Sequence, residues 1–167
     1  GFKGCWLNKW LDMMGAYTCG ISLKAEKESV YDAIKLVKRG YSAAQIKEYL
    51  QQTKADSSIY ITVATLKYLK KGGRVTPAAA ALGALLKIKP ILQIQGQKLD
   101  AFAKVLNFGQ AKNKMISAIK NDIETRFKDY YKNGELRISL AHTNCYEEIQ
   151  KFAEEVKKSF PDIEIMT

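Results

Sequence analysis

Residues Lys70–Leu92 read KKGGRVTPAAAALGALLKIKPIL, and this succession of a turn, a helix and a strand decides how the chain folds. The glycines at 72–73 end a short helix, because glycine tolerates the left-handed conformation that stops a helix. Thr76 and Pro77 begin the next helix, since proline suits the first helical position. This helix, Ala78–Leu86, has no polar face. We therefore expect apolar groups, from the protein core or from a ligand, to cover it on every side.

The apolar spacing on both sides of this stretch alternates between the helical and the extended period, which predicts an α/β fold. We expect one mixed sheet with flanking helices. Helices are expected from about residue 23 to 40 and at 43–50, 65–70, 78–86, 109–132 and 145–160. Strands are expected at 58–63, 89–95, 98–105, 138–141 and 163–165, of which 89–95 and 98–105 form a hairpin. The last strand–helix–strand unit predicts a right-handed parallel crossover.

Capping residues and apolar stripes define several of these helices. Ser42 at the N-cap and Gln45 three residues later form a capping box, and Asn144 with Glu147 gives the same signal before the last helix. The stripes predict the buried faces. They are Val30, Ala33, Ile34 and Val37 in the first helix, Ile46 and Leu50 in the second, Met115, Ile119, Ile123 and Phe127 in the long helix, and Ile149, Phe152, Val156 and Phe160 in the last.

Length and charge limit the function classes. The chain has 167 residues, which fits one domain or one domain with part of another, and its formal net charge is +10. A basic chain favours acidic partners, but most lysines lie at helical spacings opposite apolar positions and describe solvated faces. There is no arginine-rich run and no basic patch interleaved with aromatic residues at strand spacing. A nucleic-acid-binding module therefore stays only as an alternative.

Location and domain organisation follow from the cysteines and the first residues. The three cysteines Cys5, Cys19 and Cys145 include no Cys-x-x-Cys pair, and the single His142 cannot complete a metal site with them. We therefore expect no bound metal. We also expect the thiols to be reduced and the protein to be cytoplasmic. No apolar run is long enough to cross a membrane. Residues 1–20 form an N-terminal segment of uncertain origin, and 21–167 form one domain.

Three segments of the chain resemble the DegV family of bacterial fatty-acid-binding proteins. They are Leu69–Val75 (LKKGGRV), Leu82–Leu92 (LGALLKIKPIL) and Ala141–Thr143 (AHT). The resemblance extends over about residues 21–167. It implies a DegV-like fold, related to that of dihydroxyacetone kinases, of which this chain holds the C-terminal lipid-binding domain in incomplete form.

The resemblance also implies a function. In this family a long-chain fatty acid lies in a tunnel between two domains, and in many members its carboxylate is presented to a separate acyl kinase. The chain is then a carrier and not an enzyme, and the fatty acid is its ligand in place of a cofactor. A small-molecule phosphotransferase related to dihydroxyacetone kinases is the alternative, although no nucleotide-binding motif is visible.

Candidate site residues divide into a lipid wall and a partner contact. The wall needs only continuous apolar surface, because burying an acyl chain contributes about 0.8 kcal/mol per CH₂. The residues predicted to supply it are Leu82, Leu85, Leu86, Ile88 and Ile91. Arg74, on a rigid turn, suits a carboxylate, a phosphate or an acidic partner, and the resemblance implies that it contacts the kinase. No catalytic residue is predicted, and we interpret His142 and Cys145 as structural.

The chain departs from the family pattern in three places. The family's N-terminal domain, with the Thr and Pro-Ser segments that hold the carboxylate, is absent, and so is the C-terminal Ser-x-His-x-Gly-Pro-Gly segment. After the hairpin, Lys104-Val105-Leu106 carries leucine where the family usually has arginine. We therefore expect the groups that hold the ligand's carboxylate to lie outside this chain.

Overall fold

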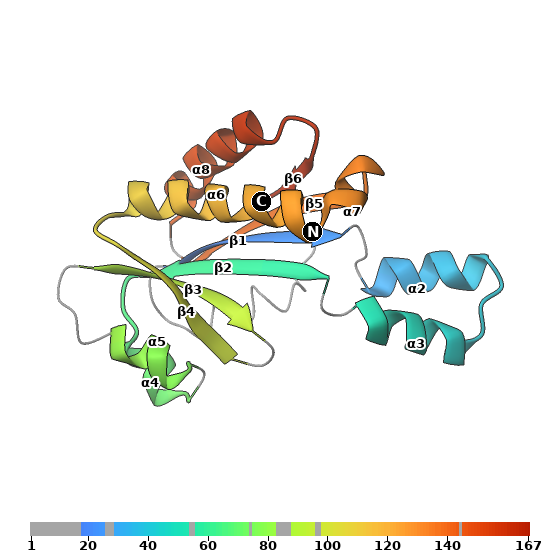
Figure 1. The fold of residues 1–167 in the computed structure, drawn as a ribbon, viewed down its shortest axis with the longest axis horizontal. Coiled ribbons are helices and arrows are strands. Elements are labelled where there is room, and N and C mark those ends of the chain that lie inside the picture. The colour runs from blue at the N-terminus through green and yellow to red at the C-terminus, as the bar shows by residue number, and fades with distance from the viewer. Residues whose placement is uncertain are drawn as a thin grey trace.

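A computed structural model describes residues 18–25, 29–53, 56–73, 75–82, 88–95, 98–143 and 145–167. The elements are β1 (Thr18–Ala25), α2 (Ser29–Lys38), α3 (Ala43–Thr53), β2 (Ser57–Val63), α4 (Lys67–Lys71), α5 (Pro77–Leu82), β3 (Lys89–Gln95), β4 (Lys98–Val105), α6 (Phe108–Thr125), α7 (Lys128–Lys132), β5 (Leu136–Thr143), α8 (Tyr146–Ser159) and β6 (Glu164–Met166). They form a mixed α/β fold around one sheet, as predicted (Figure 1).

The sheet has six strands in the order β4-β3-β2-β1-β5-β6. The neighbours from β4 to β5 run antiparallel, whereas β5 and β6 run parallel, with Arg137 paired to Glu164 and Ser139 to Met166. The parallel pairing around α8 confirms the predicted strand–helix–strand unit. The β3–β4 hairpin has the bounds that the sequence predicts.

One face of the sheet is covered by α6 and α8, and the main core lies beneath them (Figure 1). The stripe predicted for the long helix is confirmed, because all four of its residues are buried. The stripe of α8 is likewise buried, with Phe152 and Val156 fully inaccessible. A second cluster lies on the opposite face, beneath α4 and α5.

The long helix predicted for 109–132 is in fact two helices. The backbone N–H groups of Arg126 and Phe127 both donate to the carbonyl of Asp122, at 2.8 and 2.9 Å, so the regular i to i−4 pattern ends there. Phe127 then leaves the helical conformation, with φ of −116°, and is 2% exposed. Burial of this ring accompanies the break between α6 and α7.

A buried polar contact joins α6 to the sheet. The Tyr60 hydroxyl donates to Oδ2 of Asp122 at 2.8 Å, and both residues are buried. Burial, together with the Asp122 carboxylate, raises the pKa of Tyr60 well above its usual value, so the hydroxyl keeps its proton. The Arg126 guanidinium donates to Ser58 Oγ at 2.9 Å beside this pair.

Strand β1 is the main departure from the sequence prediction, which placed a helix from about Leu23. The strand lies between β2 and β5, where Ile21 pairs with Tyr60 and with Leu140. It also begins at Thr18, ahead of the domain boundary expected at residue 20. The alternation Ile21-Ser22-Leu23 is too short to identify a strand by itself, and the pairing on both sides supplies the structure.

The helices α2 and α3 form a hairpin that projects from one end of the sheet (Figure 1). The predicted capping box is confirmed, because the Gln45 amide donates to Ser42 Oγ at 3.4 Å and the Ser42 amide donates to Gln45 Oε1 at 2.9 Å. The buried stripe predicted for α2 is wrong for Ile34 and Val37, which are 45% and 62% exposed. Leu36 is buried instead.

The start of α8 also differs from its prediction. Cys145 is the N-cap, without a side-chain capping bond, so the expected cap at Asn144 is wrong by one position. Asn144 itself lies outside the described residues. Among the described helices, none combines the length and the apolar character required to cross a bilayer.

Candidate functional site

The turn from α4 to α5 is held against the hairpin. Gly73 has a φ of +63°, and its amide donates to the Lys70 carbonyl at 3.1 Å, which ends α4 as the glycine pair predicts. Val75 then pairs with Leu99 of β4, and the Thr76 amide donates to the Leu99 carbonyl at 2.9 Å. Backbone contacts therefore hold the residues on both sides of Arg74 in place. Arg74, the predicted partner contact, lies outside the described residues.

Thr76 begins α5 and joins it to β4. Its Oγ1 donates to Oδ1 of Asp100 at 2.6 Å and accepts from the Ala79 amide at 3.2 Å, so the predicted N-cap is confirmed. The bonds from Thr76 and from the Ala101 amide lower the pKa of the Asp100 carboxyl. Asp100 is therefore ionised at neutral pH and keeps the helix start in place.

The described part of α5 has one buried side. Ala79 is fully inaccessible and packs in the cluster that contains Val75, Leu92 and Leu99. Ala78 and Ala81 are exposed, so within the described residues the protein core covers only one side of this helix. Alanine methyl groups are small, and leaving them in water costs little free energy. The helix thus combines a packed side with an exposed apolar side.

The predicted wall residues lie on both faces of the sheet. Ile88 is partly buried against the cluster beneath α5, whereas Ile91 is fully buried in the core beneath α6. The structure therefore does not bring these two together. Leu92 shares the α5 side with Ile88 but is not among the predicted wall residues. Strand alternation from Ile88 could have identified it, because residues at even spacing share a face.

The remaining predicted wall residues can be located only in part. Leu82 is the last residue of α5, and its side chain lies outside the described part of the structure. Leu85 and Leu86 lie outside the described residues. The part of the apolar surface that is described therefore consists of α5, Ile88 and the cluster beneath them.

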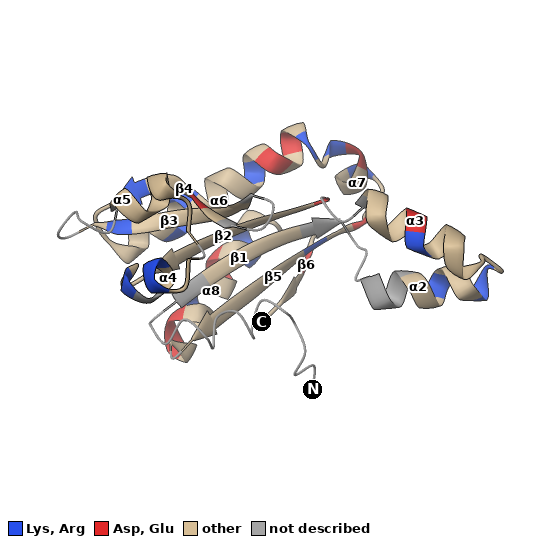
Figure 2. Cartoon of the chain, turned by 90° about the horizontal axis from the view of Figure 1, so that it is seen from below, with Lys and Arg blue, Asp and Glu red and all other residues tan. Residues whose placement is uncertain are grey.

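Next to this cluster, the same face of the sheet carries small side chains. Gly20 pairs with Ile61 on one side and Ala141 on the other, and Ser22 pairs with Ser139 in the neighbouring row. Seen from below, no described helix lies over β1, β5 and β6, whereas α4 and α5 lie over the other end of the face (Figure 2). We call this half of the face, formed by Gly20, Ser22, Ser139, Ala141 and Thr143, the small-residue surface.

One polar atom on the small-residue surface is buried without a partner. Oγ1 of Thr143 has less than 1 Å² of accessible surface and no hydrogen-bond partner among the described residues. A buried hydroxyl without a partner is unusual in a folded protein. Thr143 follows His142 at the end of β5, in the segment that resembles the family motif.

His142 and Cys145 make contacts that suit structural residues. Nδ1 of His142 accepts a bond from the Cys145 amide at 3.4 Å, and the ring meets Tyr146 edge-on at 5.9 Å between centroids. Burial raises the pKa of the Cys145 thiol, which disfavours the reactive thiolate. Within the described residues, no group of three or more His, Cys, Asp or Glu side chains is arranged to hold a metal ion.

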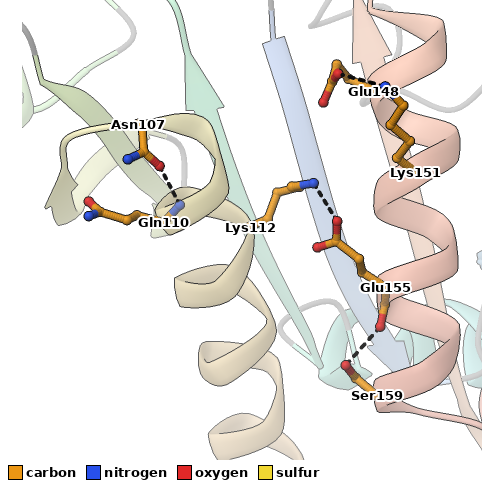
Figure 3. A network of polar contacts seen from close by, with 7 residues as sticks. All are labelled: Asn107, Gln110, Lys112, Glu148, Lys151, Glu155 and Ser159. Carbon is orange, nitrogen blue, oxygen red and sulfur yellow. Dashed lines mark hydrogen bonds and ion pairs between the residues drawn. The ribbon is translucent and has the colours of Figure 1, made fainter.

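Helix α4 and the contact between α6 and α8 differ in their charge. Helix α4 carries Lys67, Lys70 and Lys71, all exposed, and forms a basic end beside the Gly72-Gly73 turn (Figure 2). On the opposite face, Nζ of Lys112 contacts Oε1 of Glu155 at 2.6 Å and ties α6 to α8 (Figure 3). Helix α4 leaves unbalanced positive charge, and the contact between α6 and α8 is neutral.

Comparison with known sequences identifies one family. The sequence model of the DegV family, described as uncharacterised proteins, matches residues 18–167. A DegV domain-containing protein of Clostridium perfringens is 33% identical over 139 residues, which cover 82% of this chain and 45% of the relative. Protein DegV of Bacillus subtilis is 33% identical over 146 residues, 86% of this chain and 49% of the relative. The chain thus spans about half the length of the curated relatives that it matches.

Solved structures agree with this assignment. The structure described as DegV, a fatty acid binding protein from Bacillus subtilis, has a TM-score of 0.62 at 28% identity and covers 82% of this chain and 46% of its own. A stearic acid-binding protein from Eubacterium ventriosum has a TM-score of 0.68 at 24% identity, over 82% of this chain and 45% of its own. This second similarity shows the shared fold.

Proposed function

This chain belongs to the DegV family, and we propose that it is the part of a carrier protein that covers the acyl chain of a long-chain fatty acid. The similarity to a fatty acid binding protein of Bacillus subtilis supports this function. The observation that carries it is the juxtaposition of two surfaces on one sheet face. The exposed apolar side of α5 lies beside the cluster containing Ile88, and the small-residue surface continues along the same face.

The two surfaces complement each other for an acyl chain. Helix α5 and Ile88 supply apolar contact from one side, and the partly buried Ser22 and Ser139 and the buried Ala141 present only small side chains beside it. Each methylene removed from water contributes about 0.8 kcal/mol, and directional bonds are not required. We propose that the tail lies along this face, with Leu92 beneath it in place of Ile91, and that Leu82, Leu85 and Leu86 extend the wall.

This function predicts a selective effect of chain length on stability. Stearate should raise the midpoint of thermal unfolding of the purified chain as its concentration increases, because a ligand that binds the folded state stabilises it. Octanoate at the same concentration should have little effect, since it has ten fewer methylenes to bury. Equal shifts with both acids, or no shift with stearate, would contradict the proposal.

We further propose that the carrier presents the fatty acid carboxylate to an acyl kinase and performs no phosphoryl transfer itself. The two neighbours of Arg74 in the sequence are both held by backbone contacts, Gly73 to Lys70 and Val75 to Leu99. This segment of the sequence adjoins the exposed lysines of α4, so a partner with an acidic surface would meet several cations together. The scattered cysteines predict that this exchange occurs in the cytoplasm.

The role of Arg74 can be separated from ligand binding. In the full-length DegV protein with its kinase, Arg74→Ala should slow acyl phosphate formation about tenfold while stearate binding stays unchanged, because an interfacial arginine contributes about 1.4 kcal/mol or more. The matched control is Lys157→Ala, on the exposed side of α8 far from α4. If Arg74→Ala and the control give equal rates, the partner assignment is wrong.

A further inference from the structure

Three large side chains of the α2–α3 hairpin are exposed together. Ile34, Val37 and Tyr41 are 45%, 62% and 45% exposed. Ile34 and Val37, three residues apart, lie on one side of α2, and Tyr41 lies in the turn that follows the helix. The other large exposed apolar or aromatic side chains of the described chain are Leu106, Tyr131 and Tyr146, which lie on three separate segments. We call Ile34, Val37 and Tyr41 the α2 patch.

The α2 patch is held in a fixed orientation. Leu36, on another side of α2, is buried, and its carbonyl accepts a bond from the Tyr41 amide at 3.0 Å. Gly40 has a φ of +83°, which turns the chain back at the end of the helix. The patch therefore belongs to an ordered helix end.

Basic side chains surround the α2 patch. Lys35, Lys38 and Arg39 are interleaved with it and are exposed, and the sequence from 33 to 41 contains no acidic residue. Among the described residues, none of these three cations forms an ion pair. Lys47 of α3 adds another exposed cation. Positive charge is therefore available to a partner along the whole patch.

From this combination we infer that the α2–α3 hairpin docks on an anionic lipid bilayer through the α2 patch. Interfacial helices bind bilayers by burying apolar side chains at the boundary of headgroups and acyl chains while Lys and Arg meet anionic headgroups. Tyrosine suits that boundary, because its ring is apolar and its hydroxyl polar. The hairpin projects from the sheet, so it can lie on a surface without moving the core (Figure 1).

Docking goes beyond the proposed function and does not require a bound fatty acid. Sedimentation with vesicles of equal parts phosphatidylglycerol and phosphatidylcholine, free of fatty acid, tests it. The net charge of +10 attracts the chain to anionic surfaces by itself. The test is therefore the difference in vesicle binding between the parent chain and variants of the α2 patch. We expect Ile34→Ser with Val37→Ser to weaken binding about tenfold, and Lys35→Gln with Lys38→Gln about thirtyfold.

Matched controls lie on other segments. Leu106→Ser and Tyr146→Ser remove exposed side chains of similar character, and Lys157→Gln with Lys158→Gln removes the same charge from α8. Binding should remain within about threefold for these controls if the α2 patch is the docking surface. Equal losses in both sets would overturn the inference. So would a dimer in size-exclusion chromatography that Val37→Ser converts to a monomer, because a second copy would then cover the patch.

Discussion

Ser139→Phe should weaken stearate binding at least a hundredfold without unfolding the chain. Ser139 is half-buried on the small-residue surface, beside Ser22 of β1 and Met166 of β6. A phenyl ring there would occupy the volume assigned to about four methylenes of the acyl chain. Losing their contact costs about 3 kcal/mol, which corresponds to more than a hundredfold in affinity. Isothermal titration with stearate measures the change.

Two controls separate lost binding from lost structure. Ser139→Ala keeps the surface small and should bind stearate as the parent does. Ser117→Phe introduces the same ring at an exposed position of α6, on the other face of the sheet, and should have no effect. Circular dichroism should be unchanged in all three variants. If Ser139→Phe binds stearate as tightly as Ser139→Ala, the acyl chain does not lie on this surface.

Phe152→Ala should lower the free energy of unfolding by about 3–5 kcal/mol. Phe152 is fully buried beneath α8 in the core that this helix shares with α6 and the sheet, and truncation would leave a cavity there. Urea denaturation gives the value from the shift of the midpoint at constant slope. Tyr146→Ala, at a site 66% exposed on the same helix, should change stability by less than about 0.5 kcal/mol.

An effect of Phe152→Ala close to that of Tyr146→Ala would contradict the core described for this face. The two substitutions remove aromatic rings from one helix, so they differ mainly in burial. Their comparison therefore tests the packing of α8 on the sheet directly.

Local signals predicted the elements that carry strong periodicity. The β3–β4 hairpin, strand β5 and the buried stripes of α6 and α8 follow from alternation or from a spacing of three and four residues. The capping box at Ser42 follows from the reciprocal bonds that serine and glutamine form. In these places a short stretch of sequence contains the physical cause of the structure.

Other features depend on distant parts of the chain and could not be predicted locally. Strand β1 owes its conformation to pairing with β2 and β5, which are far apart in the sequence. The exposure of Ile34 and Val37 depends on what the α2–α3 hairpin packs against, and apolar spacing alone implies burial. The same limit applies to the proposed site. Composition predicts an apolar wall, but only the register of β3 shows that Ile88 and Ile91 lie on opposite faces of the sheet.

The proposed acyl-chain site combines both kinds of information. The apolar helix that contains Ala79 and the turn at Gly73 are visible in the sequence, whereas the small-residue surface is not. Gly20 and Ala141 become neighbours only when β1 and β5 pair. No sequence pattern links them, so this half of the proposed site follows only from the topology of the sheet.

Native mass spectrometry of the purified chain mixed with stearate tests the proposed function most directly. The proposal predicts a complex of one stearate with one chain. The Ser139→Ala variant should form this complex, and the Ser139→Phe variant should not. Octanoate should form no complex with the parent chain. A spectrum in which the parent chain carries no stearate at concentrations that saturate the Bacillus subtilis DegV protein would contradict it.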